Sequence, residues 1–137
     1  MQKLAKLLQP WAVNYVGYSF GYLLAVHTAM CYANNGHIID NLVLIGSPMS
    51  KTFLNKLKNH NNIKNVVVID LRQYGDPIYA GMSEIELGKS IPKLLEQING
   101  NGIGHFYYSA NGKEGRSRRY HFALDIKNSG LKWVVYD

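Results

Sequence analysis

The stretch NYVGYSFG, at residues 14–21, carries a serine between two glycines where one apolar run gives way to another. Residues 11–18 are rich in β-branched and aromatic side chains, which predicts a strand, and residues 20–33 are rich in leucine, alanine and methionine, which predicts a buried helix. Ser19 lies at the junction. A sharp turn there would push its hydroxyl out over the edge of the sheet.

Gly17 and Gly21 stand two residues to either side of Ser19, in the pattern G-x-S-x-G. A serine on such a turn requires very small neighbours wherever the strand and the helix nearly touch, and we expect both glycines to meet that requirement. Amide groups at the start of a helix lack partners within it, so the Phe20 N–H is a candidate oxyanion donor. A serine with only a structural role in a turn is the alternative interpretation.

Residues 16–21 (VGYSFG), the helix after them and residues 41–48 (NLVLIGSP) together resemble the middle of a serine α/β-hydrolase of the lipase and esterase kind. Members of that superfamily carry a nucleophile strand, a helix and another parallel strand that ends in a small-residue turn. The resemblance extends from about residue 13 to residue 105. It implies a catalytic triad in the chain order serine, then aspartate or glutamate, then histidine.

Strands and helices alternate through residue 98, which predicts an α/β fold of three αβα layers around a mainly parallel sheet. Residues 106–110 and 119–125 flank Asn111 and Gly112, which adds a C-terminal β-hairpin. The other elements that we expect are strands at residues 37–45, 66–69 and 131–136, and helices at residues 1–8, 51–58 and 83–98. The resemblance implies a partial α/β-hydrolase fold.

The chain has 137 residues, which suits a single domain spanning residues 1–137. Its content of 47% hydrophobic and 18% charged residues excludes a disordered chain. Neither a signal peptide nor an apolar run long enough to cross a membrane is evident, so we expect a soluble protein that is cytoplasmic or exported by a non-classical route. The single cysteine, Cys31, excludes an internal disulfide, and we expect it to be buried.

Asp76 is the first candidate for the acid. It follows the third expected strand, in the block YGDPI at residues 74–78, which resembles the acid loop of lipase-like hydrolases. Asp70 is the alternative, because it stands at the end of the same strand, where it could instead cap a turn.

His105 is the first candidate for the base. It follows a glycine-rich linker and begins the run HFYY, which resembles the histidine loop of the family. His121 is the alternative, and it alternates within an expected strand. His27 falls within the expected buried helix, and the two remaining histidines precede the acid and break the chain order.

A complete α/β-hydrolase has several strands ahead of the nucleophile strand, together with a loop that supplies a second oxyanion donor. The chain therefore looks like the C-terminal part of a larger fold. The strand edge between Trp11 and Tyr18 would need a cover, for which a homodimer, a parent chain or the C-terminal hairpin are the candidates.

No cofactor and no metal ion are predicted, because the histidines and carboxylates lack helical i, i+4 pairing. Residues 113–119 form the densest basic run, and Arg118 and Arg119 within it would be the contacts to a nucleic acid. A solvated loop explains the run equally well, so we do not predict a nucleic-acid partner.

The predicted function is hydrolysis of a carboxylic or lipid ester through an acyl-enzyme, by Ser19, Asp76 and His105. The alternative is a catalytically inactive hydrolase-like interaction module, or a fragment of a larger secreted effector that acts on lipid.

Overall fold

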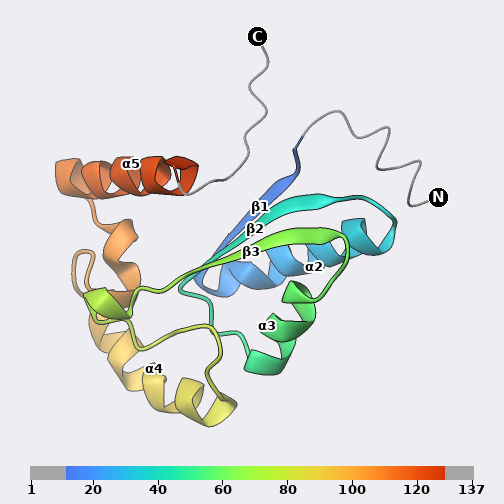
Figure 1. Cartoon of the computed structure of the whole chain (residues 1–137). Helices are drawn as coiled ribbons and strands as arrows, with labels where there is room; N and C mark the ends of the chain where they lie inside the picture. The colour runs from blue at the N-terminus through green and yellow to red at the C-terminus, as the bar shows by residue number, and fades with distance from the viewer. Residues whose placement is uncertain (1–11, 129–137) are drawn as a thin grey trace.

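A three-stranded parallel sheet lies at the centre of the chain (Figure 1). The computed structural model describes residues 12–128. Strands β1 (Asn14–Tyr18), β2 (Ile39–Ile45) and β3 (Ile63–Ile69) pair in the order β1-β2-β3, and the last residues of the three strands lie opposite one another. The loops that leave the carboxyl ends of the strands therefore start from the same edge of the sheet.

Helices α2 (Tyr22–Asn34) and α3 (Lys51–Lys58) cover one face of this sheet. Leu42 and Leu44 of β2 are fully buried and share a hydrophobic cluster with side chains of both helices. Side chains two residues apart on a strand point to the same face, so this cluster fills the space between the sheet and the two helices.

Helix α5 (Gly112–Asn128) lies against the opposite face. Val43 and Ile45 of β2 are buried there with Phe122 and Ile126 of α5. The described chain is thus a small α/β fold with helices on both faces of a parallel sheet, and that part of the prediction is confirmed.

The predicted C-terminal β-hairpin is wrong. The 3-10 helix η3 (Gly104–Ser109) and α5 occupy that part of the chain. The Asn111 N–H donates to the side chain of Asn101 (2.8 Å) rather than to a facing strand. Phe122 and Ile126 are four residues apart and therefore share one side of a helix, and both pack, partly buried, against the sheet.

Helix α4 (Glu84–Ile98) begins with a capping box at Ser83 and Glu86. The Ser83 hydroxyl accepts the Glu86 N–H (3.2 Å), and the Glu86 carboxylate accepts the Ser83 N–H (2.9 Å). Pro92 lies inside the helix, which continues to Ile98. The side of α4 that faces the protein buries two polar residues, Ser90 and Gln97.

The expectation of a fully buried helix after Ser19 is wrong. Helix α2 buries one side only, whereas Leu24 on the other side is 75% exposed, and both His27 and Cys31 are exposed. A helix composed of apolar residues all round carries no periodicity from which the buried side can be read.

The helix expected at residues 1–8 and the strand expected at residues 131–136 lie outside the described part of the chain. Within residues 12–128, no helix combines the length and the apolarity that crossing a membrane requires. Over the same residues, β1 pairs with β2 alone, so its other edge faces no strand.

Candidate active site

Ser19 sits on a one-residue bend at the carboxyl end of β1. Its φ is +54°, and among the described residues other than glycine it alone has a positive φ. Tyr18 before it is extended, and the 3-10 helix η1 (Ser19–Gly21) leads directly into α2. A left-handed conformation costs a non-glycine residue about 1–3 kcal/mol, and such strain concentrates at functional sites.

Gly17 is required by this bend. A Cβ at that position would lie 2.6 Å from the Tyr22 Cα and 3.1 Å from the Ala25 Cβ, so β1 and α2 touch there. The prediction for Gly17 is confirmed. Gly21 differs, because an added Cβ would meet no atom within 4 Å and its φ of −61° suits any residue. The prediction that Gly21 must be small is wrong.

Three side chains named from the sequence meet at this edge of the sheet. The Ser19 Oγ lies 2.5 Å from the His105 Nε2, and the His105 Nδ1 lies 2.8 Å from the Asp76 Oδ2. His105 and Asp76 are each 3% exposed. With the proton on Nδ1 donated to the carboxylate, Nε2 presents a lone pair to the hydroxyl.

The Asp76 carboxylate is held on its other side as well. Its Oδ1 accepts the Ile78 N–H (2.7 Å), which closes the turn through Pro77. The loop follows the 3-10 helix η2 (Arg72–Tyr74), which comes after β3. Asp76 is thereby fixed as an acceptor for the imidazole.

Gly46, directly after β2, makes room for the pair. Its φ is +51°, and an added Cβ would lie 3.1 Å from the Asp76 Oδ2 and 3.6 Å from the His105 Cε1. The end of β2 therefore forms the floor beneath the carboxylate and the imidazole.

Neither alternative residue reaches Ser19. Partial burial acts to raise the pKa of Asp70, but hydrogen bonds from Arg72 outweigh it and lower that pKa; the Asp70 carboxylate accepts the Arg72 N–H at 2.8 Å. His121 is exposed on α5, where its Nδ1 lies 2.8 Å from the carbonyl oxygen of Ser117. The structure brings Asp76 and His105 to the serine and leaves the alternatives elsewhere.

The backbone of His105 is held from both sides. Its N–H donates to the Gln97 Oε1 (3.0 Å), and its carbonyl oxygen accepts the Tyr18 hydroxyl (2.5 Å). Burial raises the pKa of that phenol. The Gln97 Nε2 in turn donates to the carbonyl oxygen of Gly75 (2.9 Å).

Sequence reasoning missed Gln97. The sequence offered one signal, the spacing of seven residues that puts Gln97 on the same side of an amphipathic helix as Ser90. The structure buries both residues. Residues seven apart share a side of a helix, so burial of one suggests burial of the other.

The Phe20 N–H lies at the first turn after Ser19, where amides have no partner within the helix. The Phe20 side chain is 52% exposed. An amide without a partner within the helix can donate to a negative charge that develops next to the hydroxyl. Among residues 12–128, no group of three or more histidine, cysteine, aspartate or glutamate side chains is placed to hold a metal ion.

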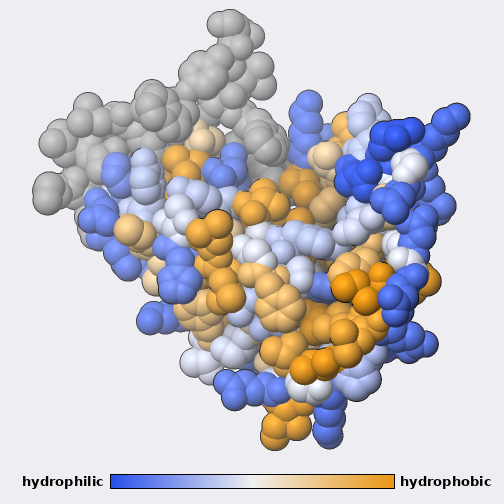
Figure 2. Space-filling model, turned by 180° about the vertical axis from the view of Figure 1, so that it is seen from behind, coloured by the Kyte–Doolittle hydropathy of each residue, from blue (hydrophilic) through white to orange (hydrophobic). Residues whose placement is uncertain are grey.

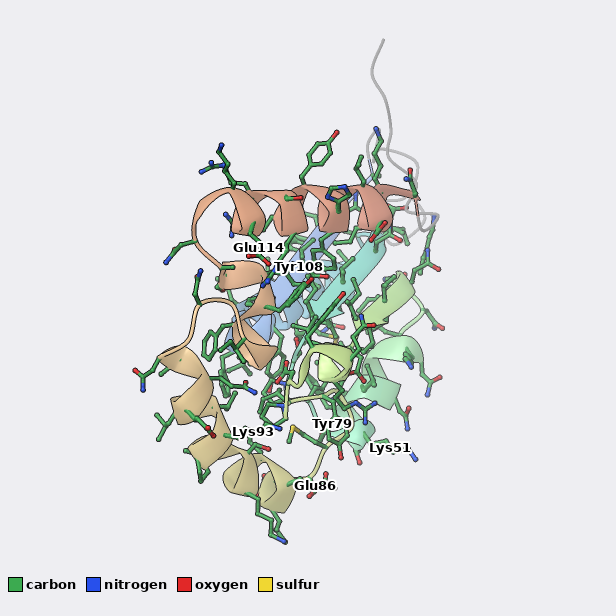
Figure 3. The ribbon with its side chains drawn as sticks, turned by 90° about the vertical axis from the view of Figure 1, so that its left-hand side faces the viewer. Lys51, Tyr79, Glu86, Lys93, Tyr108 and Glu114 are labelled. Carbon is green, nitrogen blue, oxygen red and sulfur yellow. The ribbon has the colours of Figure 1, made fainter. Side chains whose placement is uncertain are left out.

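The basic run at residues 113–119 lies on α5 rather than in a loop, and two of its arginines bind the chain itself. Arg118 donates to the carbonyl oxygens of Gly102 (2.9 Å) and Tyr107 (3.0 Å), and Arg119 to that of Tyr108 (2.9 Å). Tyr108 and Glu114, labelled in Figure 3, line a cavity of about 400 Å³ between η3 and α5. That cavity contains none of the three residues at the serine.

One hydrogen bond links the hydroxyl to the imidazole and another links the imidazole to the carboxylate. This arrangement can activate the hydroxyl as a nucleophile. The imidazole can accept the hydroxyl proton as the oxygen attacks a carbonyl carbon, and the carboxylate stabilises the imidazolium that forms. Comparisons of this chain with protein-family models, with curated proteins and with solved structures found no match. The geometry of the site is therefore the basis for assigning a function to this chain.

Proposed function

We propose that this chain is a serine ester hydrolase, lipase-like or esterase-like, that cleaves a carboxylic or lipid ester through an acyl-enzyme. The observation that carries the proposal is the unbroken hydrogen-bonded succession from the Ser19 Oγ through the His105 ring to the Asp76 carboxylate. The strained bend that presents the hydroxyl supports it further.

In the proposed reaction the Ser19 Oγ attacks the ester carbonyl while the His105 Nε2 takes the hydroxyl proton. The oxyanion that develops faces the Phe20 N–H. When the tetrahedral intermediate collapses, His105 returns the proton to the leaving alcohol and an acyl group remains on Ser19. Water, deprotonated by the same imidazole, then releases the acid. The Asp76 carboxylate stabilises the imidazolium.

The order of the elements supports a partial α/β-hydrolase fold. Ser19 follows β1, Asp76 follows β3 and His105 follows α4, which is the serine, acid, histidine order of that superfamily. The closely packed glycine before the serine agrees with the same turn geometry.

Exposed apolar side chains on the segment that follows Ser19 support an apolar acyl group. Phe20 comes directly after Ser19 and is 52% exposed, and Leu23 and Leu24 near the start of α2 are 46% and 75% exposed. Figure 2 shows apolar side chains on the face of the molecule that is turned away from the viewer in Figure 1. Exposed apolar side chains on a segment that carries a reactive hydroxyl favour ligands that have an apolar part.

Hydrolysis of a short-chain aryl ester tests the proposal. We expect Ser19→Ala and His105→Ala to lower kcat/KM by at least about 10⁴-fold, as for residues of a catalytic triad. Ser117→Ala and His121→Ala are matched controls, because that serine and histidine also contact one another, at 3.4 Å, but on exposed α5. A folded Ser19→Ala variant that retains the wild-type rate would remove the proposal.

An inactive hydrolase-like interaction module is the second candidate. The β1 edge that pairs with no described strand and the 55% exposure of Val16 favour it, because such an edge offers pairing groups to another chain. A folded wild-type protein without esterase activity would favour this candidate.

A further inference from the structure

We infer that Gln97 is a positioning residue that fixes the base, His105, relative to the acid, Asp76. This inference rests on the proposed function. It lies near the end of α4 and is 6% exposed. One amide group spans two loops: its oxygen accepts the His105 N–H (3.0 Å) and its nitrogen donates to the Gly75 carbonyl (2.9 Å). Gly75 precedes Asp76, so Gln97 binds the backbone at both partners of the imidazole and carboxylate pair.

Helix α4 provides a fixed base for this amide. Besides Gln97, the Ser90 hydroxyl donates to the carbonyl oxygen of Pro77 (3.3 Å), and the Tyr79 hydroxyl donates to Glu86 in the first turn of α4 (2.8 Å). Tyr79, Glu86 and the helix between Glu86 and Lys93 are visible in Figure 3. The acid loop is thus bound along the whole length of α4, whereas the histidine loop is bound to this helix at its end.

The histidine loop is shaped to receive Gln97. Gly104 has a φ of +57°, and a Cβ added there would lie 2.2 Å from the Gln97 Nε2 and 2.4 Å from its Cδ. Glycine is therefore needed at residue 104 both for its conformation and for the close approach of the amide. If Gln97 only filled space, its amide would not need to form hydrogen bonds with backbone groups on two loops.

The amide is the chemically suitable group at this position. It combines one acceptor with donors, which match a peptide N–H on one loop and a carbonyl on the other. An apolar side chain of the same length would leave both backbone groups without this partner, and an ionised carboxylate could not donate. Since the His105 backbone directs its ring, the loss of Gln97 changes how Nε2 meets the Ser19 hydroxyl.

The test compares Gln97→Met and Gln97→Glu with Asn99→Ala. Methionine keeps the length and removes both bonds, and glutamate keeps the acceptor for His105 and removes the donor for Gly75. Asn99 stands at the end of α4, where its side chain donates to the Leu95 carbonyl of the same helix (3.4 Å) and not to either loop. Two quantities are measured in folded protein: kcat and KM on an aryl ester, and the downfield NMR resonance of the His105 Nδ1 proton shared with Asp76.

We expect Gln97→Met to lower kcat by about 10²-fold with KM within about twofold, because it misplaces a reacting group without removing a substrate contact. Gln97→Glu should fall between Gln97→Met and the wild type, and Asn99→Ala should match the wild type. The Nδ1 proton resonance should be lost or shifted in Gln97→Met. If Gln97→Met keeps both kcat and this resonance, the inference is overturned while the proposed function stands.

The NMR measurement separates the two failures. If the wild type is inactive but its Nδ1 proton resonance is lost in Gln97→Met and kept in Asn99→Ala, the positioning role stands and the proposed function fails. If Gln97→Met does not fold, Gln97→Glu decides: a kcat and resonance equal to those of the wild type overturn the inference.

Discussion

The two halves of the site are built in different ways. The serine half belongs to the sheet: Ser19 takes its position from the end of β1, from its own backbone bend and from the contact between Gly17 and α2. The other half lies on two loops, which carry Asp76 and His105 and are held by side-chain hydrogen bonds from Gln97 and Tyr18.

This difference shows where each half is vulnerable. A residue fixed by backbone packing is disturbed by added volume, because a packed strand and helix cannot separate cheaply. A residue on a loop is disturbed by the removal of single side-chain hydrogen bonds, because these bonds hold backbone groups that have no partners in a helix or sheet. Substitutions that add volume therefore test the serine half, and substitutions that remove a charge or a hydrogen bond test the loop half.

The largest effect is expected at the acid, in the loop half. Asp76→Asn keeps the shape of the side chain but removes the charge that orients the imidazole, and we expect kcat to fall by about 10⁴-fold. Asp70→Asn is the matched control, because its carboxylate binds Arg72 and not His105. Both variants are assayed on the same aryl ester, and equal activities for the two would contradict the assignment of the acid.

The next effect is expected in the sheet half. Gly17→Ala places a methyl group against the backbone of Tyr22, and we expect a loss of about 1–3 kcal/mol in the free energy of unfolding. Gly21→Ala has free space and a compatible φ, and we expect a gain of about 0.4–1 kcal/mol. Urea denaturation of both variants checks the pair. A loss in Gly21→Ala as large as in Gly17→Ala would show that the contact does not control this bend.

A smaller effect is expected at the bond that joins the two halves. Tyr18→Phe removes the hydroxyl that donates to the His105 carbonyl, and we expect a loss of about 1 kcal/mol at neutral pH. Burial raises the pKa of Tyr18 above 10.0, so the folded state favours the protonated phenol. The stabilisation of the folded state by the protonated Tyr18 hydroxyl is complete below about pH 10. It is lost as the pH rises through the folded-state pKa. The stability difference between wild type and Tyr18→Phe should therefore narrow above pH 10 in urea titrations. A difference that widens there would contradict the assignment.

Much of the sheet half could be predicted from the sequence, because it follows from local signals. The β-branched run before Ser19, the capping box at Ser83 and Glu86 and the apolar run of β2 each determine their own element. The nearness of Asp76 and His105 was predicted through a family resemblance and chain order, not from periodicity.

The remainder depends on tertiary contacts that local patterns do not encode. Residues 119–125 alternate as a strand would, yet they form part of α5, in which Phe122 and Ile126 pack, partly buried, against the sheet. Gln97 was overlooked because its partners are backbone groups of two distant loops. The expectation that Gly21 must be small was wrong, because only Gly17 of the two glycines lies where the strand and the helix approach closely.

The most direct test of the central claim is the reaction of the folded protein with a fluorophosphonate, followed by mass spectrometry of its peptides. The Ser19 oxygen would displace fluoride from phosphorus and leave a covalent adduct. We predict one adduct, on Ser19, with a labelling rate that falls by several orders of magnitude in His105→Ala and is unchanged in His121→Ala. A folded wild-type protein that remains unlabelled at Ser19, or that is labelled equally fast without His105, would contradict the account.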